Sequence, residues 1–365
     1  MKKRFLFFLA LLYSFGYNSS LKGIKEPGED GPLVAAAKKL EPAGETTFFD
    51  PYNLVSSSQH GKLDTLATGF KFTEGPVADR RGNVFFTDQP DDRIYKWDAG
   101  SGKVTLFLQG TGRSNGMAFD NQGNLVTCAD MHGELWKIRP DGSHEILVDN
   151  YNGQKLNGPN DIWINPVTGG IYITDPIFPR SYWLDSDPRK INNPGWPPVW
   201  SGQGPGLAGH VYYLAPGNKN LVRVTTMMEW SSANSWPNGI VGTPDGKKLY
   251  VSKWTGNNKA GTWSFDIERD GTLSNMKKFI EWGGDGMSLD ERGNLYISNG
   301  EGLMAFDPKG NNILKIPTGG GATNNVFAGK NNKLLVITGG GLTSPRGPDR
   351  LTAVKMNVKG VERFK

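Results

Sequence analysis

Six side chains with an oxygen atom at the tip recur in one register along the chain. The clearest copy is Gly284-Asp285-Gly286-Met287. In this copy, and in those that start at Glu74 and Asn115, Asp lies five positions on, Gly eight on and Asn nine on. Three further copies fit with one or two residues of slack. We call the first polar side chain of each copy a slot residue, and the six are Glu74, Asn115, Asn160, Asn238, Asp285 and Asn324.

Two carboxylates and four amides form a donor set that suits a hard divalent cation. Ca²⁺ takes six to eight oxygen ligands from carboxylates, amide carbonyls and water. Mg²⁺ and Mn²⁺ accept the same oxygens, whereas Zn²⁺ is less favoured because the slots contain neither His nor Cys. The alternative is that Asn and Asp before Gly are ordinary turn residues. A single register shared by six copies, with Glu in one of them, favours the cation.

The spacing of the slots indicates the elements that must position them. The intervals between slots are 41, 45, 78, 47 and 39 residues, and four of them match the length of a four-stranded propeller blade. Each slot precedes a short apolar strand, a D-x-x-G-N hairpin turn and a second strand, such as 294–298. We therefore predict an all-β, six-bladed β-propeller over residues 48–365, with the slot residues in a ring at one mouth of the central channel.

Two regions fall outside the repeat. The strands expected at 63–67 and 351–356 lie at the two ends, and pairing them in a shared or adjoining blade would remove exposed edges. The long interval holds an insertion at about 177–206 that is rich in Pro, Trp and Tyr. Loops of this length are usually functional or disordered. We expect a lid over the site; a structural cap and an interaction surface are the alternatives.

The N-terminus and the overall charge limit the class of protein. Residues 1–20 have the charged start and short apolar run of a secretory signal, too short for a membrane span, so we expect a periplasmic or secreted protein without membrane attachment after cleavage. Residues 21–47 read as a flexible lead-in. Signal removal reduces the formal charge of +5 to about +2, which disfavours nucleic acid as a partner. The single Cys128 permits no internal disulfide.

The ordered set of motifs resembles the SMP-30/gluconolactonase family, the group of senescence marker protein 30 and regucalcin-like lactone hydrolases. The similarity spans about residues 48–356. Its motifs are Thr73-Glu74-Gly75-Pro76, Leu156-Asn157-Gly158-Pro159-Asn160-Asp161, Ile173-Thr174-Asp175-Pro176, Pro237-Asn238-Gly239 and Gly284-Asp285-Gly286-Met287. The resemblance implies a six-bladed propeller with one divalent metal ion at the channel mouth.

The resemblance also implies roles for single residues. The metal ligands fall on Glu74, Asn160, Asn238 and Asp285, and Asp285 is in addition the proposed general base. Asn115 and Asn324 match the frame and are expected to contact substrate or water. His132, at the end of a second strand, is a candidate proton relay, with a surface or turn histidine as the alternative. The family's animal members have Arg where this chain has Gly158, so contacts to the lactone are expected to differ.

These residues predict a gluconolactonase-like hydrolase that opens a sugar lactone by attack of a metal-bound water, with Asp285 taking the proton. The absence of a G-x-S-x-G motif agrees with direct water attack rather than an acyl-enzyme. The alternative is a non-catalytic binding or scaffold propeller, NHL-like or strictosidine-synthase-like, with a structural metal ion. The expected partner is therefore a small-molecule lactone, and the oligomeric state is left open.

Overall fold

The computed structural model describes residues 47–59, 61–176, 178, 209–225, 236–254, 261–341 and 347–362. The signal peptide expected at 1–20 and nearly all of the lead-in expected at 21–47 lie outside the described residues. The same holds for the insertion at about 177–206, apart from Phe178. No helix among the described residues is long and apolar enough to cross a membrane.

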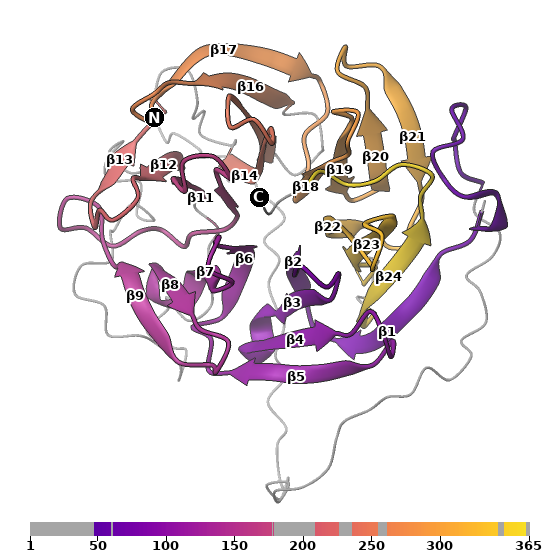
Figure 1. The fold of residues 1–365 in the computed structure, drawn as a ribbon, viewed down its shortest axis with the longest axis horizontal. Coiled ribbons are helices and arrows are strands. Elements are labelled where there is room, and N and C mark those ends of the chain that lie inside the picture. The colour runs from indigo at the N-terminus through magenta and orange to yellow at the C-terminus, as the bar shows by residue number, and fades with distance from the viewer. Residues whose placement is uncertain are drawn as a thin grey trace, which may run out of the picture. The chain divides into compact units, whose positions relative to one another are not determined.

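Six four-stranded antiparallel sheets surround a central axis, which confirms the predicted all-β, six-bladed β-propeller (Figure 1). From the innermost strand outwards, blade 1 contains β2 (Thr73–Ala78), β3 (Val84–Asp88), β4 (Arg93–Trp97) and β5 (Val104–Gln109), and blade 2 contains β6 (Ser114–Phe119), β7 (Leu125–Ala129), β8 (Glu134–Ile138) and β9 (His144–Val148). Blade 3 contains β10 (Ile162–Ile164), β11 (Ile171–Asp175), β12 (His210–Leu214) and β13 (Leu221–Arg223), and blade 4 contains β14 (Trp236–Gly242), β15 (Lys248–Trp254), β16 (Thr262–Ile267) and β17 (Leu273–Ile280). Blade 5 contains β18 (Met287–Leu289), β19 (Leu295–Asn299), β20 (Gly302–Phe306) and β21 (Asn312–Ile316), and blade 6 contains β22 (Ala322–Ala328), β23 (Leu334–Gly339), β24 (Asp349–Lys355) and β1 (Asp64–Phe70).

Blade 6 closes the ring by joining the two ends of the described chain. Its outermost strand β1 pairs antiparallel with β24, with Asp64 opposite Ala353 and Phe70 opposite Asp349. This arrangement confirms the expected pairing of the terminal strands in a shared blade. The only helices among the described residues are three single 3₁₀ turns, η1 (Ser57–Gln59), η2 (Gln89–Asp91) and η3 (Asp130–His132).

The hairpin turns explain the strict D-x-x-G-N spacing. Asp79 Oδ1 accepts the backbone N–H groups of Arg81 (2.8 Å) and Asn83 (2.9 Å), while its Oδ2 accepts the side-chain amide of Asn83 (2.8 Å). Gly82 has a φ of +79°, a value that glycine adopts without strain. The turns at Asp120, Asp290 and Asp307 repeat the same three hydrogen bonds. The motif therefore fixes the register of these four hairpins.

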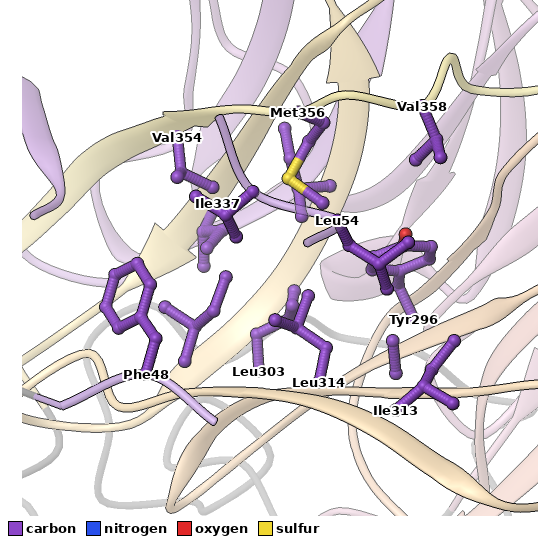
Figure 2. Packing of buried hydrophobic residues seen from close by; sticks show 14 of the residues in the cluster. Phe48, Leu54, Tyr296, Leu303, Ile313, Leu314, Ile337, Val354, Met356 and Val358 are labelled. Atoms are coloured by element: carbon purple, nitrogen blue, oxygen red, sulfur yellow. The ribbon is translucent and has the colours of Figure 1, made fainter. Parts of the chain in front are cut away.

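The hydrophobic core lies between neighbouring blades. One cluster joins blades 5 and 6 through Tyr296 and Leu314 on one side and Ile337 on the other. Figure 2 shows Phe48 and Leu54, from the start of the described chain, packed into this cluster with Met356 and Val358 from its end. Burial of such side chains is the main stabilising contribution in a propeller without disulfides. Cys128, the single cysteine, is buried in another of these seams.

Candidate functional site

The six slot residues lie at the same end of the six inner strands. Glu74 and Asn115 are the second residues of β2 and β6, Asn238 and Asn324 are the third residues of β14 and β22, and Asn160 and Asp285 lie two residues before β10 and β18. Five of them are at most 6% exposed, and Asp285 is half-buried. The predicted register therefore does place these side chains at one mouth of the channel.

Contacts join this ring across each seam between neighbouring blades. The seams are bridged by hydrogen bonds or by close approach of one backbone to the next. Two seams are closed by a glycine packed against a backbone carbonyl of the next blade, Gly75 against Asn115 and Gly239 against Asp285. The other four seams have hydrogen bonds, from Gly116 N–H to Asn160 O (2.7 Å), Ile240 N–H to Asp161 Oδ2 (3.3 Å), Gly286 N–H to Thr323 O (2.7 Å) and Asn324 Nδ2 to Glu74 Oε2 (3.1 Å).

Glycine follows four of the six slots because the next blade fills the space of a side chain there. A Cβ added to Gly75 would lie 2.1 Å from the carbonyl oxygen of Asn115, and Gly75 also has a φ of +50°. A Cβ on Gly286 would lie 1.7 Å from Cγ of Asn324. Both distances are far below ordinary van der Waals contact. The glycines around the slots are therefore required by close packing at the channel mouth.

Buried carboxylates hold the loops that carry the slot residues. Asp175, at the end of β11, accepts hydrogen bonds from the backbone N–H groups of Asn157 and Gly158, both at 3.0 Å. Burial raises the pKa of Asp175 to about 7. Gly158 has a φ of +141°, and a Cβ there would lie 2.4 Å from Oδ1 of Asp130. The Arg of the family's animal members therefore could not replace Gly158 without moving Asp130.

Three carboxyl groups interact electrostatically within the ring. Burial raises the pKa of Glu74 well above its usual range, and the nearby carboxylates of Asp285 and Asp161 raise it further, while the N–H of Gly75 opposes them. Burial also raises the pKa of Asp161 to about 7, against hydrogen bonds that favour its ionised form. A cation among these groups would stabilise their charged forms.

The ring also contains polar atoms that the protein leaves without partners. Oδ1 of Asn115 and Oδ1 of Asn238 have no hydrogen-bond partner among the described residues, although the two side chains are only 2% and 3% exposed. Buried polar atoms in native proteins are nearly always satisfied. No three His, Cys, Asp or Glu side chains of the described chain gather closely enough to hold a metal ion by themselves. The carboxylate and amide oxygens of the ring together form a donor set that fits a divalent cation.

His132 lies away from the ring contacts. It belongs to η3, after the second strand of blade 2, and its ring stacks on Trp136 with centroids 5.5 Å apart. Trp136 stacks in turn on His144 of the outer strand, 4.2 Å away. The structure thus places His132 in an aromatic stack directed along the blade. Its role as a proton relay stays a prediction.

Sequence reasoning missed Asp161. This residue follows the slot residue Asn160, at a position where four of the other slots have glycine. It is 7% exposed and lies at the ring end of a cavity of about 110 Å³ that the six inner strands enclose. Val361 and Glu362, near the end of the described chain, also line this cavity. The departure from glycine after Asn160 was the signal that could have identified Asp161.

Comparison with known proteins identifies the family of this chain. Residues 72–340 match the family described as the SMP-30/gluconolactonase/LRE-like region. A gluconolactonase from Zymomonas mobilis is 27% identical over 294 residues, which cover 73% of this chain and 75% of that protein. The lactonase drp35 of Staphylococcus haemolyticus is 25% identical over 321 residues, covering 80% and 85%.

Solved structures give the same result. A gluconolactonase from Xanthomonas campestris superposes with a TM-score of 0.65 at 30% identity, covering 81% of this chain and 89% of that one. Regucalcin from Agrobacterium tumefaciens, described as a calcium-binding protein, shares the fold with a TM-score of 0.63 at 19% identity, covering 83% and 96%. With most of its propeller matched by the family, the chain belongs to the SMP-30/gluconolactonase/LRE-like family.

Proposed function

We propose that this protein is a metal-dependent hydrolase that opens a small lactone, with Asp285 as the general base. The observation that carries the proposal is the ring of six oxygen-bearing side chains, in which Asn115 Oδ1 and Asn238 Oδ1 are buried and find no hydrogen-bond partner in the part of the chain that the structure describes. The relatives described as gluconolactonases and as a lactonase support the lactone as the substrate class.

The donor set favours Ca²⁺ over softer metal ions. Glu74, Asn160, Asn238 and Asp285 would hold the ion through carboxylate and amide oxygens, with Mg²⁺, Mn²⁺ or Zn²⁺ as alternatives. Both described hydrogen bonds to the Glu74 carboxylate use Oε2, which leaves Oε1 for a ligand. When bound, the cation would polarise the lactone carbonyl and stabilise the negative charge that develops on its oxygen.

Asp285 is better placed than Glu74 to move a proton. Glu74 is 3% exposed and its Oε2 is held by Gly75 and Asn324, whereas Asp285 is half-buried at the mouth. In the proposed reaction the Asp285 carboxylate accepts a proton from a water whose oxygen attacks the carbonyl carbon. The bond from that carbon to the ring oxygen then breaks, and the proton passes to the departing oxygen, giving a hydroxy acid.

Acid release from a panel of lactones that includes glucono-1,5-lactone tests this function. We expect turnover that chelation abolishes and added Ca²⁺ restores. Asp285→Asn should lower turnover strongly, whereas Asp307→Asn, in an outer hairpin turn, is the matched control and should not. Turnover that survives both chelation and Asp285→Asn would overturn the mechanism. Cation binding without turnover of any lactone would instead favour a binding propeller with a structural metal ion.

We also propose that the protein is exported to the periplasm or secreted. The support is the sequence of residues 1–20, with its three positive charges followed by a short apolar run. The mass and N-terminal sequence of the mature protein, purified from the cell envelope or the medium, test the proposal. A cytoplasmic chain that retains Met1 to Ser20 would contradict it.

A further inference from the structure

The side chain of Asn324 is engaged at both ends within the protein. Its Nδ2 donates a hydrogen bond to Oε2 of Glu74 (3.1 Å), and its Oδ1 accepts one from the backbone N–H of Asn325 (2.8 Å). The amide also lowers the pKa of Asp161, against the larger effect of burial. Asn324 is only 6% exposed. An amide with these partners has little capacity left for a substrate.

Hydrogen bonds from two blades hold Asp161. Its Oδ1 accepts the backbone N–H of Ile162 in blade 3 (2.9 Å), and its Oδ2 accepts that of Ile240 in blade 4 (3.3 Å). These bonds fix the position of the carboxylate, because moving it would break contacts to more than one blade.

The neighbouring glycines provide the space for these two side chains. A Cβ on Gly116 would lie 2.5 Å from Oδ1 of Asp161, and a Cβ on Gly286 would lie 1.7 Å from Cγ of Asn324. Glycine thus follows the slots at Asn115 and Asp285, where the side chains of Asp161 and Asn324 occupy the space of a Cβ. The two glycines and the two side chains come from four different blades.

We propose that Asn324 is a positioning residue, whose side-chain amide holds Glu74 in the orientation that binds the cation. The inference rests on the metal site of the proposed function but not on lactone hydrolysis. It gives Asn324 a role different from the substrate contact expected from the sequence.

The physical reason is that Glu74 has several rotatable bonds and that the carboxylates of Asp285 and Asp161 repel it. The Asn324 amide opposes this repulsion because it donates a hydrogen bond to Oε2 of Glu74 (3.1 Å). Without the amide, Glu74 loses a hydrogen bond and the repulsion is no longer offset, so its carboxylate is less well oriented. Groups that orient metal ligands typically contribute ten- to a hundredfold to metal affinity.

Calcium titration calorimetry on the full chain tests the proposal. Asn324→Ala is expected to raise the Kd for Ca²⁺ by about ten- to a hundredfold, with the KM for the lactone at saturating Ca²⁺ changed less than twofold. Gly286→Ala, whose added Cβ would lie 1.7 Å from Cγ of Asn324, should weaken Ca²⁺ binding in the same direction and provides a second variant if Asn324→Ala does not fold. Asn325→Ala is the matched control, since this buried amide donates instead to Ser298 Oγ and the carbonyl of Gly286.

The outcomes separate the alternatives. An unchanged Kd for Ca²⁺ with a raised KM in Asn324→Ala would show substrate contact and overturn the proposal. Equal losses of affinity in Asn325→Ala and Asn324→Ala would indicate general loosening and would also overturn it. If the wild type binds Ca²⁺ but hydrolyses no lactone, the hydrolase function fails while a selective loss of affinity in Asn324→Ala still supports the positioning role.

Discussion

Gly286 is a position at which one added methyl group should disturb the Asn324 side chain of the ring. Gly286→Ala adds a Cβ beside Asn324 without requiring a strained backbone, because Gly286 is not among the residues with positive φ. The Cβ would lie 1.7 Å from Cγ, 1.9 Å from Oδ1 and 2.2 Å from Nδ2 of Asn324. The whole amide therefore has to move.

The size of this movement follows from the distances. Ordinary van der Waals contact begins at 3.4 Å, so a contact of 1.7 Å must open by at least a further 1.7 Å. The hydrogen bond from Asn324 to Glu74 is 3.1 Å long and does not survive such a shift. Overpacking of this kind costs about 1–3 kcal/mol of the free energy of unfolding. We also expect the affinity for Ca²⁺ to fall by about ten- to a hundredfold.

Chemical denaturation and calcium titration of Gly286→Ala measure the two effects. Gly347→Ala is the matched control, because a Cβ there meets nothing within 4 Å among the described residues and its φ is not positive. The control should keep both the free energy of unfolding and the Kd for Ca²⁺. If Gly286→Ala also keeps wild-type Ca²⁺ affinity, the inference that the packing of Asn324 orients Glu74 is refuted.

Three further predictions follow from the structure. A Cβ on Gly360 would lie 2.2 Å from Cβ of the buried Phe327, so Gly360→Ala should lower the free energy of unfolding by about 1–3 kcal/mol, and a wild-type urea midpoint would contradict this. Burial, and to a smaller extent the charge of Arg223, lowers the pKa of His210 from 6.5 to about 4. The unfolded chain therefore binds the proton more tightly, and the free energy of unfolding should fall as pH drops from about 6.5 to 4. His210→Gln should lose part of this pH dependence, and equal pH profiles of stability for the variant and the wild type would refute the assignment. A ligand that binds only the folded state, at a concentration of a hundred times its Kd, stabilises that state by about 2.7 kcal/mol. Ca²⁺ should therefore raise the melting temperature of the wild type, and raise it less in Glu74→Ala. Equal shifts in melting temperature would place the ion elsewhere.

The fold could be predicted because its signals are local and repeated. The Asp of each D-x-x-G-N turn binds the backbone two and four residues on, so the spacing alone fixes the hairpin, as at Asp79 and Asp290. The slot residue of each blade lies at the channel mouth, just before the inner strand in two blades and within its first three residues in the other four. The pairing of β1 with β24 could also be anticipated, because two spare strands at the chain ends cover each other's exposed edges when they pair.

The contacts across blades could not be predicted in the same way. Asp161 of blade 3 accepts a hydrogen bond from Ile240 of blade 4, and the sequence contains no spacing that relates these two positions. His132 could not be assigned either, because its stacking on Trp136 depends on the side-chain direction of a 3₁₀ turn. Repetition identifies the ring, whereas the partners of each side chain depend on packing between segments distant in the sequence.

A crystal structure of the protein with Mn²⁺ or Ca²⁺ and the hydroxy acid product tests the central claim most directly. We expect one ion per chain at the channel mouth, bound by Glu74, Asn160, Asn238 and Asp285. We also expect a product oxygen within hydrogen-bonding distance of the Asp285 carboxylate. An ion bound elsewhere, or a product acid remote from Asp285, would contradict it.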